Sequence, residues 1–173
     1  MGDTRRIVIL GEDQAHRNFA RGLLLGLRYE RRDLHEENLP AGGSGQSYVI
    51  RKYPEVREEF LRKQRMNRKC ALIAFLDLDS GEYSLTGNEL CLLIAYCRRN
   101  VETWIHALIE DDVVDEETNY KPRQTDLAIA TKAGGLLASA LIDGNIDDKW
   151  PTQLRLFANR VQSFRANCQL RTK

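Results

Sequence analysis

The sequence lacks the features that would place this chain in a membrane or mark it for export. None of its apolar runs approaches the roughly 20 residues that a membrane-spanning helix needs. Asp3, Arg5 and Arg6 lead directly into a short apolar run, so we expect no signal peptide and a cytoplasmic protein without a membrane partner. Internal repeats and low-complexity segments are missing too, and 173 residues suffice for one domain with a real core.

Cysteine is scarce, and its spacing excludes the common paired arrangements. The four cysteines contain no Cys-x-x-Cys pair, and three of them lie in apolar stretches; they are Cys70, Cys91, Cys97 and Cys168. We therefore expect buried, reduced thiols, with metal binding and disulfide formation as less favoured alternatives.

Two common nucleotide-binding devices are also missing. The glycine-rich stretch at 42–45 does not end in the Lys-Ser/Thr of a P-loop, and no aromatic cluster offers a stacking platform for single strands. What is present is an uneven charge distribution behind a net charge of only +1. Residues 1–69 contain 15 basic and 10 acidic side chains, residues 70–118 contain 2 and 11, and residues 119–173 contain 9 and 4. An acidic centre between basic flanks suits a cation site whose surroundings attract a polyanion, although ordinary clustering of surface charge is the alternative.

Apolar periodicity predicts an α/β protein. Residues 6–10 form an apolar run without alternation, which is typical of a strand buried on both faces, and helical spacing follows over 13–27. A poorer strand at 33–40, a helix ending near 66 and a strand ending at Asp77 come next. Further helices are expected at 101–108, at 127–142, and after Pro151. We expect a mainly parallel sheet flanked by helices, with a core at 1–125 and a helical extension at 126–173 packed on the same domain.

The segment 89–97 is ambiguous. Thr86 and Glu89 have capping-box spacing, which favours a helix, whereas the uniformly apolar sequence favours a buried strand. We favour the strand. In that case only Ser80 to Glu89 connects it to the preceding strand, although a parallel crossover usually needs a dozen residues or more.

Acidic residues follow two of the predicted strands. Glu12 comes just after the first strand, and Asp77 and Asp79 end a later one. In a parallel sheet these carboxylates converge on one edge, where functional residues gather. Crowded carboxylates repel one another unless a cation neutralises them, and Mg²⁺ prefers such oxygen ligands.

The chain resembles the Toprim domain on the motifs "VILGED" and "AFLDLDSG". The stretches "RNVETWI", "LPAGGSGQSYVIRKYPE" and "VDEETNYK" are similar to segments of a small Toprim-like family associated with prokaryotic antiphage defence. That family is similar to the nuclease-type Toprim of overcoming-lysogenization-defect proteins. The resemblance covers most of residues 6–121 and implies a Toprim-like α/β fold.

The resemblance also implies a role for individual residues. Glu12 resembles the Toprim glutamate of general acid/base chemistry or metal binding, and Asp77 and Asp79 resemble the pair that binds Mg²⁺ or Mn²⁺. Glu102 resembles an additional acidic residue that serves a second metal. Lys121 is the candidate for stabilising developing charge, with Lys132 as the second choice.

We therefore expect a Mg²⁺-dependent nuclease subunit acting on DNA, or on RNA, in antiphage defence. The alternatives are a non-catalytic interaction module with the same fold and, less favoured, a phosphotransferase of the haloacid-dehalogenase type. The resemblance implies an ATPase partner that controls the nuclease, and an apolar patch on the helix at 154–168 is the expected contact.

Two further groups of residues complete the sequence-based expectations. A basic helix is a candidate contact for the nucleic-acid backbone through Arg51, Lys52, Arg62, Lys63 and Arg65. His16 and His106 each stand four residues after an acidic residue, at helical spacing. We expect both to be surface imidazoles, with a transition-metal site as the alternative.

Overall fold

A computed structural model describes residues 6–37, 45–66, 68–78, 85–118, 120 and 126–168. Its centre is a four-stranded, all-parallel sheet in the order β2-β1-β3-β4. The strands are β1 (Arg6–Leu10), β2 (Leu34–Glu36), β3 (Cys70–Leu78) and β4 (Leu92–Arg98). The helices in the described ranges are α1 (Gln14–Gly26), η1 (Arg31–Asp33), α2 (Gly45–Arg65), α3 (Val101–Glu110), α4 (Leu127–Asp143) and α5 (Thr152–Asn167). The predicted fold class, a parallel sheet flanked by helices, is confirmed, and the arrangement is consistent with a Toprim-like fold.

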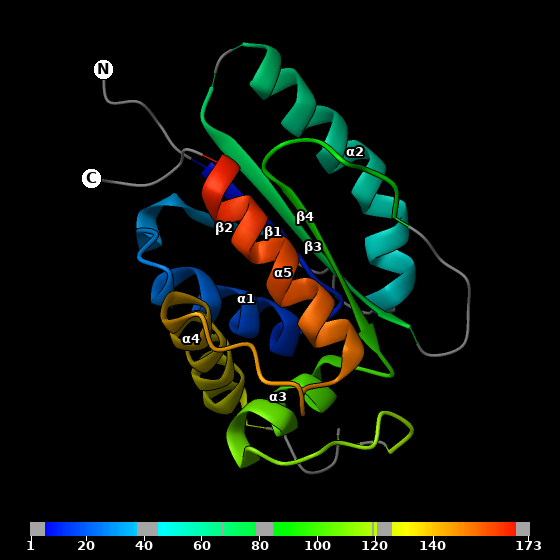
Figure 1. The fold of residues 1–173 in the computed structure, drawn as a ribbon. Coiled ribbons are helices and arrows are strands. Elements are labelled where there is room, and N and C mark those ends of the chain that lie inside the picture. The colour runs from blue at the N-terminus through cyan, green and yellow to red at the C-terminus, as the bar shows by residue number, and fades with distance from the viewer. Residues whose placement is uncertain are drawn as a thin grey trace.

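Helices cover both faces of the sheet (Figure 1). Helix α2 lies on one face, while α1, α3 and α5 lie on the other, with α4 packed outside α1. Central strand β3 is therefore buried along nearly its whole length, which explains its uninterrupted apolar sequence. Its side chains alternate, so that Phe75 joins the core beneath α1 and Leu76 joins the core beneath α2.

The segment 89–97 contains strand β4, which pairs in parallel with β3, so the favoured strand prediction is confirmed. The described part of the connection, residues 85–91, contains no helix. It is instead held against α2 by three side chains of that helix. The Tyr53 hydroxyl donates to the Thr86 carbonyl at 2.8 Å, Arg57 pairs with Glu89, and Gln64 donates to the Leu90 carbonyl at 2.7 Å. The described part of the connection is thus an irregular strap along α2.

An aromatic cluster forms the centre of the larger core. The rings of Phe19, Phe75, Trp104 and Phe157 come from α1, β3, α3 and α5, and neighbouring centroids lie 5.2–6.5 Å apart. These separations and their tilted orientations are typical of favourable aromatic packing. The four elements are therefore tied to a single core, to which the C-terminal helix belongs.

The stripe predicted on the last helix faces this core. Its members are all buried: Leu154, Phe157, Val161, Phe164 and Cys168. The prediction of a core stripe is confirmed. The expected partner contact on this helix stays a prediction, and the buried stripe residues are not available for it. Leu156, on the outer side of α5, remains 46% exposed.

The cysteine prediction is half right. Cys70 and Cys97 are buried free thiols, as expected. Cys91 and Cys168, however, form a disulfide with an S–S distance of 2.12 Å that joins the start of β4 to the end of α5. The two residues lie 77 positions apart, so sequence spacing gave no sign of their meeting.

No helix in the described ranges is both long enough and apolar enough to cross a bilayer.

Candidate functional site

The sheet order fixes where a site can form. The chain leaves β1 through α1 on one face and reaches β3 through α2 on the opposite face. Strand order therefore reverses between β1 and β3. Open parallel sheets bind their ligands in a crevice at such a switch point, outside the carboxyl ends of the strands. Glu12 follows β1 directly, and Asp77 is the last residue but one of β3. The two predicted site residues thus lie at the switch point of the sheet.

Glu12 and Asp77 are in direct contact. The backbone N–H of Asp77 donates to Oε1 of Glu12 at 2.6 Å, and both residues are buried. The first turn of α2 closes over them, because Gln46 donates from Nε2 to the Asp77 carbonyl at 2.9 Å. Gly45 is required at this point: a Cβ there would lie only 2.7 Å from the carbonyl oxygen of Glu12.

This environment changes the acidity of Glu12. Burial, and then the neighbouring Asp77 carboxylate, raise the pKa of Glu12 to about 7, although the Asp77 N–H bond and His16 act in the opposite direction. A carboxyl group with such a pKa exchanges its proton near neutral pH. A divalent cation placed beside it would favour the ionised form.

His16 is the residue whose environment differs most from the prediction. It is fully buried, so the expectation of a surface imidazole is wrong. Its Nδ1 lies 2.8 Å from Oδ1 of Asp13 and its Nε2 lies 2.8 Å from Oδ1 of Asp77. Both ring nitrogens face carboxylates, which only the protonated imidazole can satisfy as a donor on each side. Burial alone would lower the pKa of His16, but Asp77 and Asp13 raise it well above its ordinary value.

Asp13 explains why His16 takes this position. It is the N-cap of α1, and its Oδ1 accepts the backbone N–H of His16 at 3.0 Å as well as contacting the ring. The cap therefore fixes the first turn of the helix and the orientation of the imidazole together. The cluster contains a built-in cation between two carboxylates.

Cys97 is a further member of the site that sequence reasoning missed. It is the direct neighbour of Asp77 across the β3–β4 pair, on the same face of the sheet. Burial raises the pKa of its thiol to about 12. Ligand atoms of His16, Asp77 and Cys97 all lie within 4.8 Å of one another, the one such metal-ligating group in the described ranges. The available signal was its place at the end of an apolar strand, the same place that Asp77 has in β3.

The remaining predicted site residues divide into three cases. Glu102 is buried in the first turn of α3, just after β4, and so lies toward the same carboxyl edge of the sheet. Asp79 and Lys121 lie outside the described residues. Lys132 is exposed on α4. His106 is half-buried and stacks on Tyr120 at a centroid distance of 4.3 Å, so it is no simple surface imidazole either.

The predicted basic residues lie along α2 and fall into two groups. Arg51 is exposed near the start of the helix, and its neighbour Lys52 pairs with Glu55 at 2.6 Å. The other group occupies the last turns: Arg62 and Arg65 are exposed, while Lys63 pairs with Glu59. Because α2 contains 21 residues, the two ends are about 30 Å apart. The second group therefore lies toward the edge of the sheet opposite Glu12.

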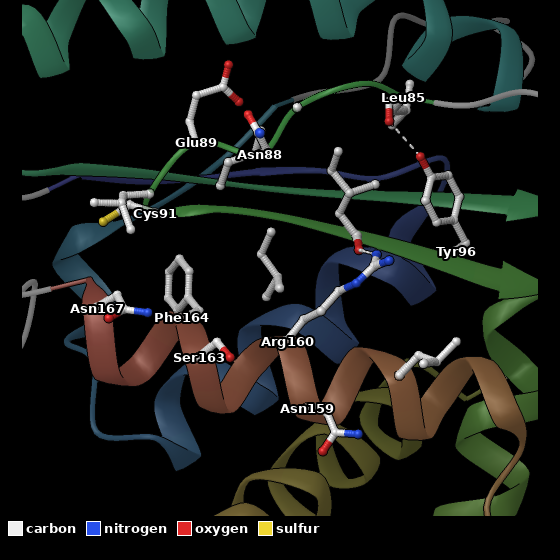
Figure 2. Close-up of a pocket in the computed structure, with 16 residues that line it drawn as sticks. Leu85, Asn88, Glu89, Cys91, Tyr96, Asn159, Arg160, Ser163, Phe164 and Asn167 are labelled. Carbon is white, nitrogen blue, oxygen red and sulfur yellow. Dashed lines mark hydrogen bonds between the residues drawn. The ribbon is translucent and has the colours of Figure 1, made fainter.

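A groove of about 610 Å³ lies apart from these carboxylates, between the strap 85–91, the outer edge of β4 and helix α5 (Figure 2). Arg160 reaches across it and donates to the Ile94 carbonyl at 3.2 Å, and Tyr96 donates to the Leu85 carbonyl at 2.7 Å. These bonds satisfy carbonyls and protect the open edge of the sheet. The groove contains none of the predicted catalytic residues.

The donor set at the switch point fits a hard divalent cation, because the Glu12 carboxylate contacts the backbone of Asp77 and both side chains offer carboxylate oxygens. Comparisons with known proteins identify no family for this chain: no family model, no curated protein and no solved structure matches it. The Toprim resemblance therefore rests on the sequence motifs, and the function is argued below as a proposal.

Proposed function

We propose that this chain is a Mg²⁺- or Mn²⁺-dependent nuclease subunit of the Toprim type, cleaving phosphodiester bonds in DNA, or in RNA. The observation that carries the proposal is the contact between Glu12 and the backbone of Asp77 at the switch point. It joins acidic residues of two motifs, 65 positions apart in the sequence, in one crevice. The Toprim resemblance requires this convergence, and a mere run of surface acids would not produce it.

Glu12 and Asp77 are the residues that would hold the ion, and Asp79 and Glu102 are the further ligands that the resemblance implies. The bound ion would supply Lewis-acid stabilisation of the charge that develops on the phosphate. His16 acts as a positioning residue, because its bond to Oδ1 fixes the orientation of the Asp77 carboxylate.

Glu12 has the properties of a general acid/base. Its Oε1 accepts the Asp77 N–H, so Oε2 is the atom at which a proton can be taken up or released. In the metal-free cluster the pKa of Glu12 is about 7, and a bound cation would favour the ionised form that a general base needs. Lys121 remains the proposed stabiliser of developing negative charge.

The surroundings of the crevice suit a negatively charged substrate. Helices α1 and α2 both begin there, and helix N-termini favour phosphate groups. The exposed Arg51 and its neighbour Lys52 lie within two turns of the start of α2 and extend a positive surface from the site. We propose DNA before RNA as the substrate.

One observation supports the second candidate, an interaction module without catalysis. His16 already neutralises Asp77 and Asp13, so the cluster is stable without an external cation. Such a module would need no buried glutamate of raised pKa beside the aspartate, which is why the nuclease is preferred. A phosphotransferase of the haloacid-dehalogenase type likewise leaves Glu12 without a role.

A nuclease of this kind requires control in its own cell. We propose a cytoplasmic assembly for antiphage defence, in which an ATPase partner restrains or activates the chain. The buried stripe of α5 cannot be its docking surface, so the contact must use another face. The lone chain should therefore cleave weakly or not at all.

Cleavage by the native assembly tests the proposal. The tagged chain is purified from its host with whatever accompanies it, and cleavage of duplex DNA is measured in Mg²⁺ and in EDTA. Glu12→Gln should reduce the rate at least about 100-fold, the usual contribution of a general acid/base group. Glu36→Gln, at the carboxyl end of β2, is the matched control and should cleave at the parental rate. Parental cleavage by the Glu12 variant, or cleavage that survives EDTA, would contradict the proposal.

A further inference from the structure

His16, Asp77 and Cys97 form a cluster that phosphodiester cleavage by oxygen-bound ions does not explain. A hard cation such as Mg²⁺ has no use for a thiol or an imidazole. Yet the three ligand atoms lie within 4.8 Å of one another, and the exposures of His16, Asp77 and Cys97 are 0%, 5% and 0%. They come from three different elements, α1, β3 and β4, so no single local motif brings them together.

The surroundings of His16 match those of a metal-bound histidine. Its Nδ1 contacts the Asp13 carboxylate at 2.8 Å, which holds the ring with Nε2 directed at Asp77. Carboxylate–histidine pairs of this kind orient metal ligands and strengthen them. The N-cap position of Asp13 makes the arrangement rigid, because the same oxygen also accepts the backbone N–H of His16.

We propose that Nε2 of His16, Oδ1 of Asp77 and Sγ of Cys97 bind Zn²⁺, with Asp13 as the partner that orients the histidine. A nitrogen, an oxygen and a sulfur ligand together suit zinc, which accepts all three. Three protein ligands are also the number used by catalytic zinc sites, where the fourth position holds water or substrate.

The space required is small. Nε2 and Oδ1 are now 2.8 Å apart and share a proton, whereas two ligand atoms of a tetrahedral zinc ion are about 3.3 Å apart. Zinc would replace that shared proton after a separation of about half an ångström, which side-chain rotation can provide.

Replacement of two protons by zinc also leaves the net charge of the cluster unchanged. In the metal-free cluster a protonated His16 satisfies the carboxylates on both sides of its ring, and Cys97 is a buried free thiol. Zinc binding releases the Nε2 proton and the thiol proton, and the ion adds two positive charges. The buried cluster therefore keeps the same net charge with and without zinc, so that binding does not leave an uncompensated charge in the core.

This zinc site does not rest on the proposed nuclease function. Asp77 is common to both sites and His16 contacts it, but Cys97 serves zinc alone and Glu12 serves the hard cation alone. Variants of Cys97 and of Glu12 therefore test the two proposals separately.

The test uses the full, untagged chain produced in zinc-supplemented medium and dialysed, with zinc measured by mass spectrometry. Co²⁺ substitution provides a second readout, because a cobalt–thiolate bond gives a charge-transfer band that oxygen ligands do not. Cys97→Ser is compared with Cys70→Ser, which also removes one buried free thiol but lies at the opposite end of β3. Asp13→Asn keeps an N-capping side chain and tests the orienting partner.

The parent and Cys70→Ser should bind one zinc ion and show the cobalt band. Cys97→Ser should lose the band and bind zinc more than about 10-fold more weakly, and Asp13→Asn should retain the band with affinity reduced about 10- to 100-fold. A parent chain that binds no zinc would overturn the proposal. So would a cobalt band that survives in Cys97→Ser, and the Asp13 variant decides the matter if the Cys97 variant fails to fold.

Discussion

Glu12 and His16 stand four residues apart and meet the same aspartate in different ways. Glu12 accepts the backbone N–H of Asp77, whereas His16 contacts its carboxylate. The imidazole compensates one negative charge, and Glu12 is left as the group whose ionisation the site resists. A cation bound at the crevice would remove that resistance, which couples metal binding to the charge of a single residue.

The raised pKa of Glu12 makes a prediction for stability in the absence of metal. Its folded pKa of about 7 lies above the ordinary 4.5, so between these values the folded state binds more protons than the unfolded state. The free energy of unfolding then falls as pH rises through this window. Glu12→Gln removes the effect, so relative to the parent the variant should gain stability between about pH 5 and about pH 8, by up to about 3 kcal/mol.

Urea unfolding of the variant and of the parent in EDTA at both pH values measures this difference. The pKa assignment would be wrong if the stability difference between the Glu12 variant and the parent were the same at both pH values.

At the scale of elements, α1 and α4 pack with their backbones in close contact. A Cβ on Gly134 would lie 2.1 Å from the Phe19 carbonyl oxygen, and one on Gly22 would lie 2.0 Å from that of Thr131. Backbone meets backbone at both points, so only glycine fits. α4 thereby holds α1 in place, and α1 carries Asp13 and His16 into the site.

Two adjacent glycines of α4 provide a matched test of this packing. Gly134→Ala should destabilise the protein by about 1–3 kcal/mol, because the new methyl group cannot be accommodated without moving α1. Gly135→Ala has nothing within 4 Å of its added Cβ and should stabilise the helix by up to about 1 kcal/mol. Thermal or urea unfolding of the two variants measures the contrast, and equal effects would refute this account of the helix contact.

These elements show what the sequence could and could not predict. Apolar periodicity located the strands and helices, because burial on one or both faces leaves a pattern in the chain itself. The packing role of Gly134 leaves no such pattern, because the partner backbone is a long-range neighbour. The strap 85–91 also followed no local rule, since its bonds to α2 depend on tertiary contacts.

The residues of the site also include some that the sequence could predict and some that it could not. Glu12 and Asp77 were predictable because strand ends in a parallel sheet share one edge. His16 and Cys97 were not, because their role depends on the register that sets Cys97 beside Asp77 and on the cap that turns the ring inward. The Cys91–Cys168 disulfide depends equally on a tertiary contact between β4 and α5.

At the scale of the whole molecule, the charges on α2 bear on the size of the proposed substrate. The exposed Arg51 and Arg65 are about 21 Å apart along the helix, so a mononucleotide cannot reach both. A polymer can, because a duplex places a phosphate charge about every 1.7 Å along its axis. The distribution of charge on α2 therefore favours a nucleic acid over a nucleotide as the ligand of this surface.

The disulfide ties the two ends of the C-terminal half together. It encloses β4, α3, α4 and the whole of α5 within a loop closed between residues 77 positions apart, which corresponds to a stabilisation of about 4.5 kcal/mol in the chain-entropy account. Disulfides are unusual in reducing compartments, so the proposed cytoplasmic setting would keep these cysteines reduced. The aromatic core beneath α5 does not depend on the bond.

Titration of the chelator-treated, untagged chain with Mn²⁺, followed by calorimetry, tests the central claim that Glu12 and Asp77 form a divalent-cation site. The parent should bind Mn²⁺ saturably, and Glu12→Gln should bind at least about 10-fold more weakly, because one charged oxygen ligand is lost. Glu36→Gln should bind like the parent. Mn²⁺ binding of equal strength in the parent and in Glu12→Gln, or no binding by the parent, would contradict the account.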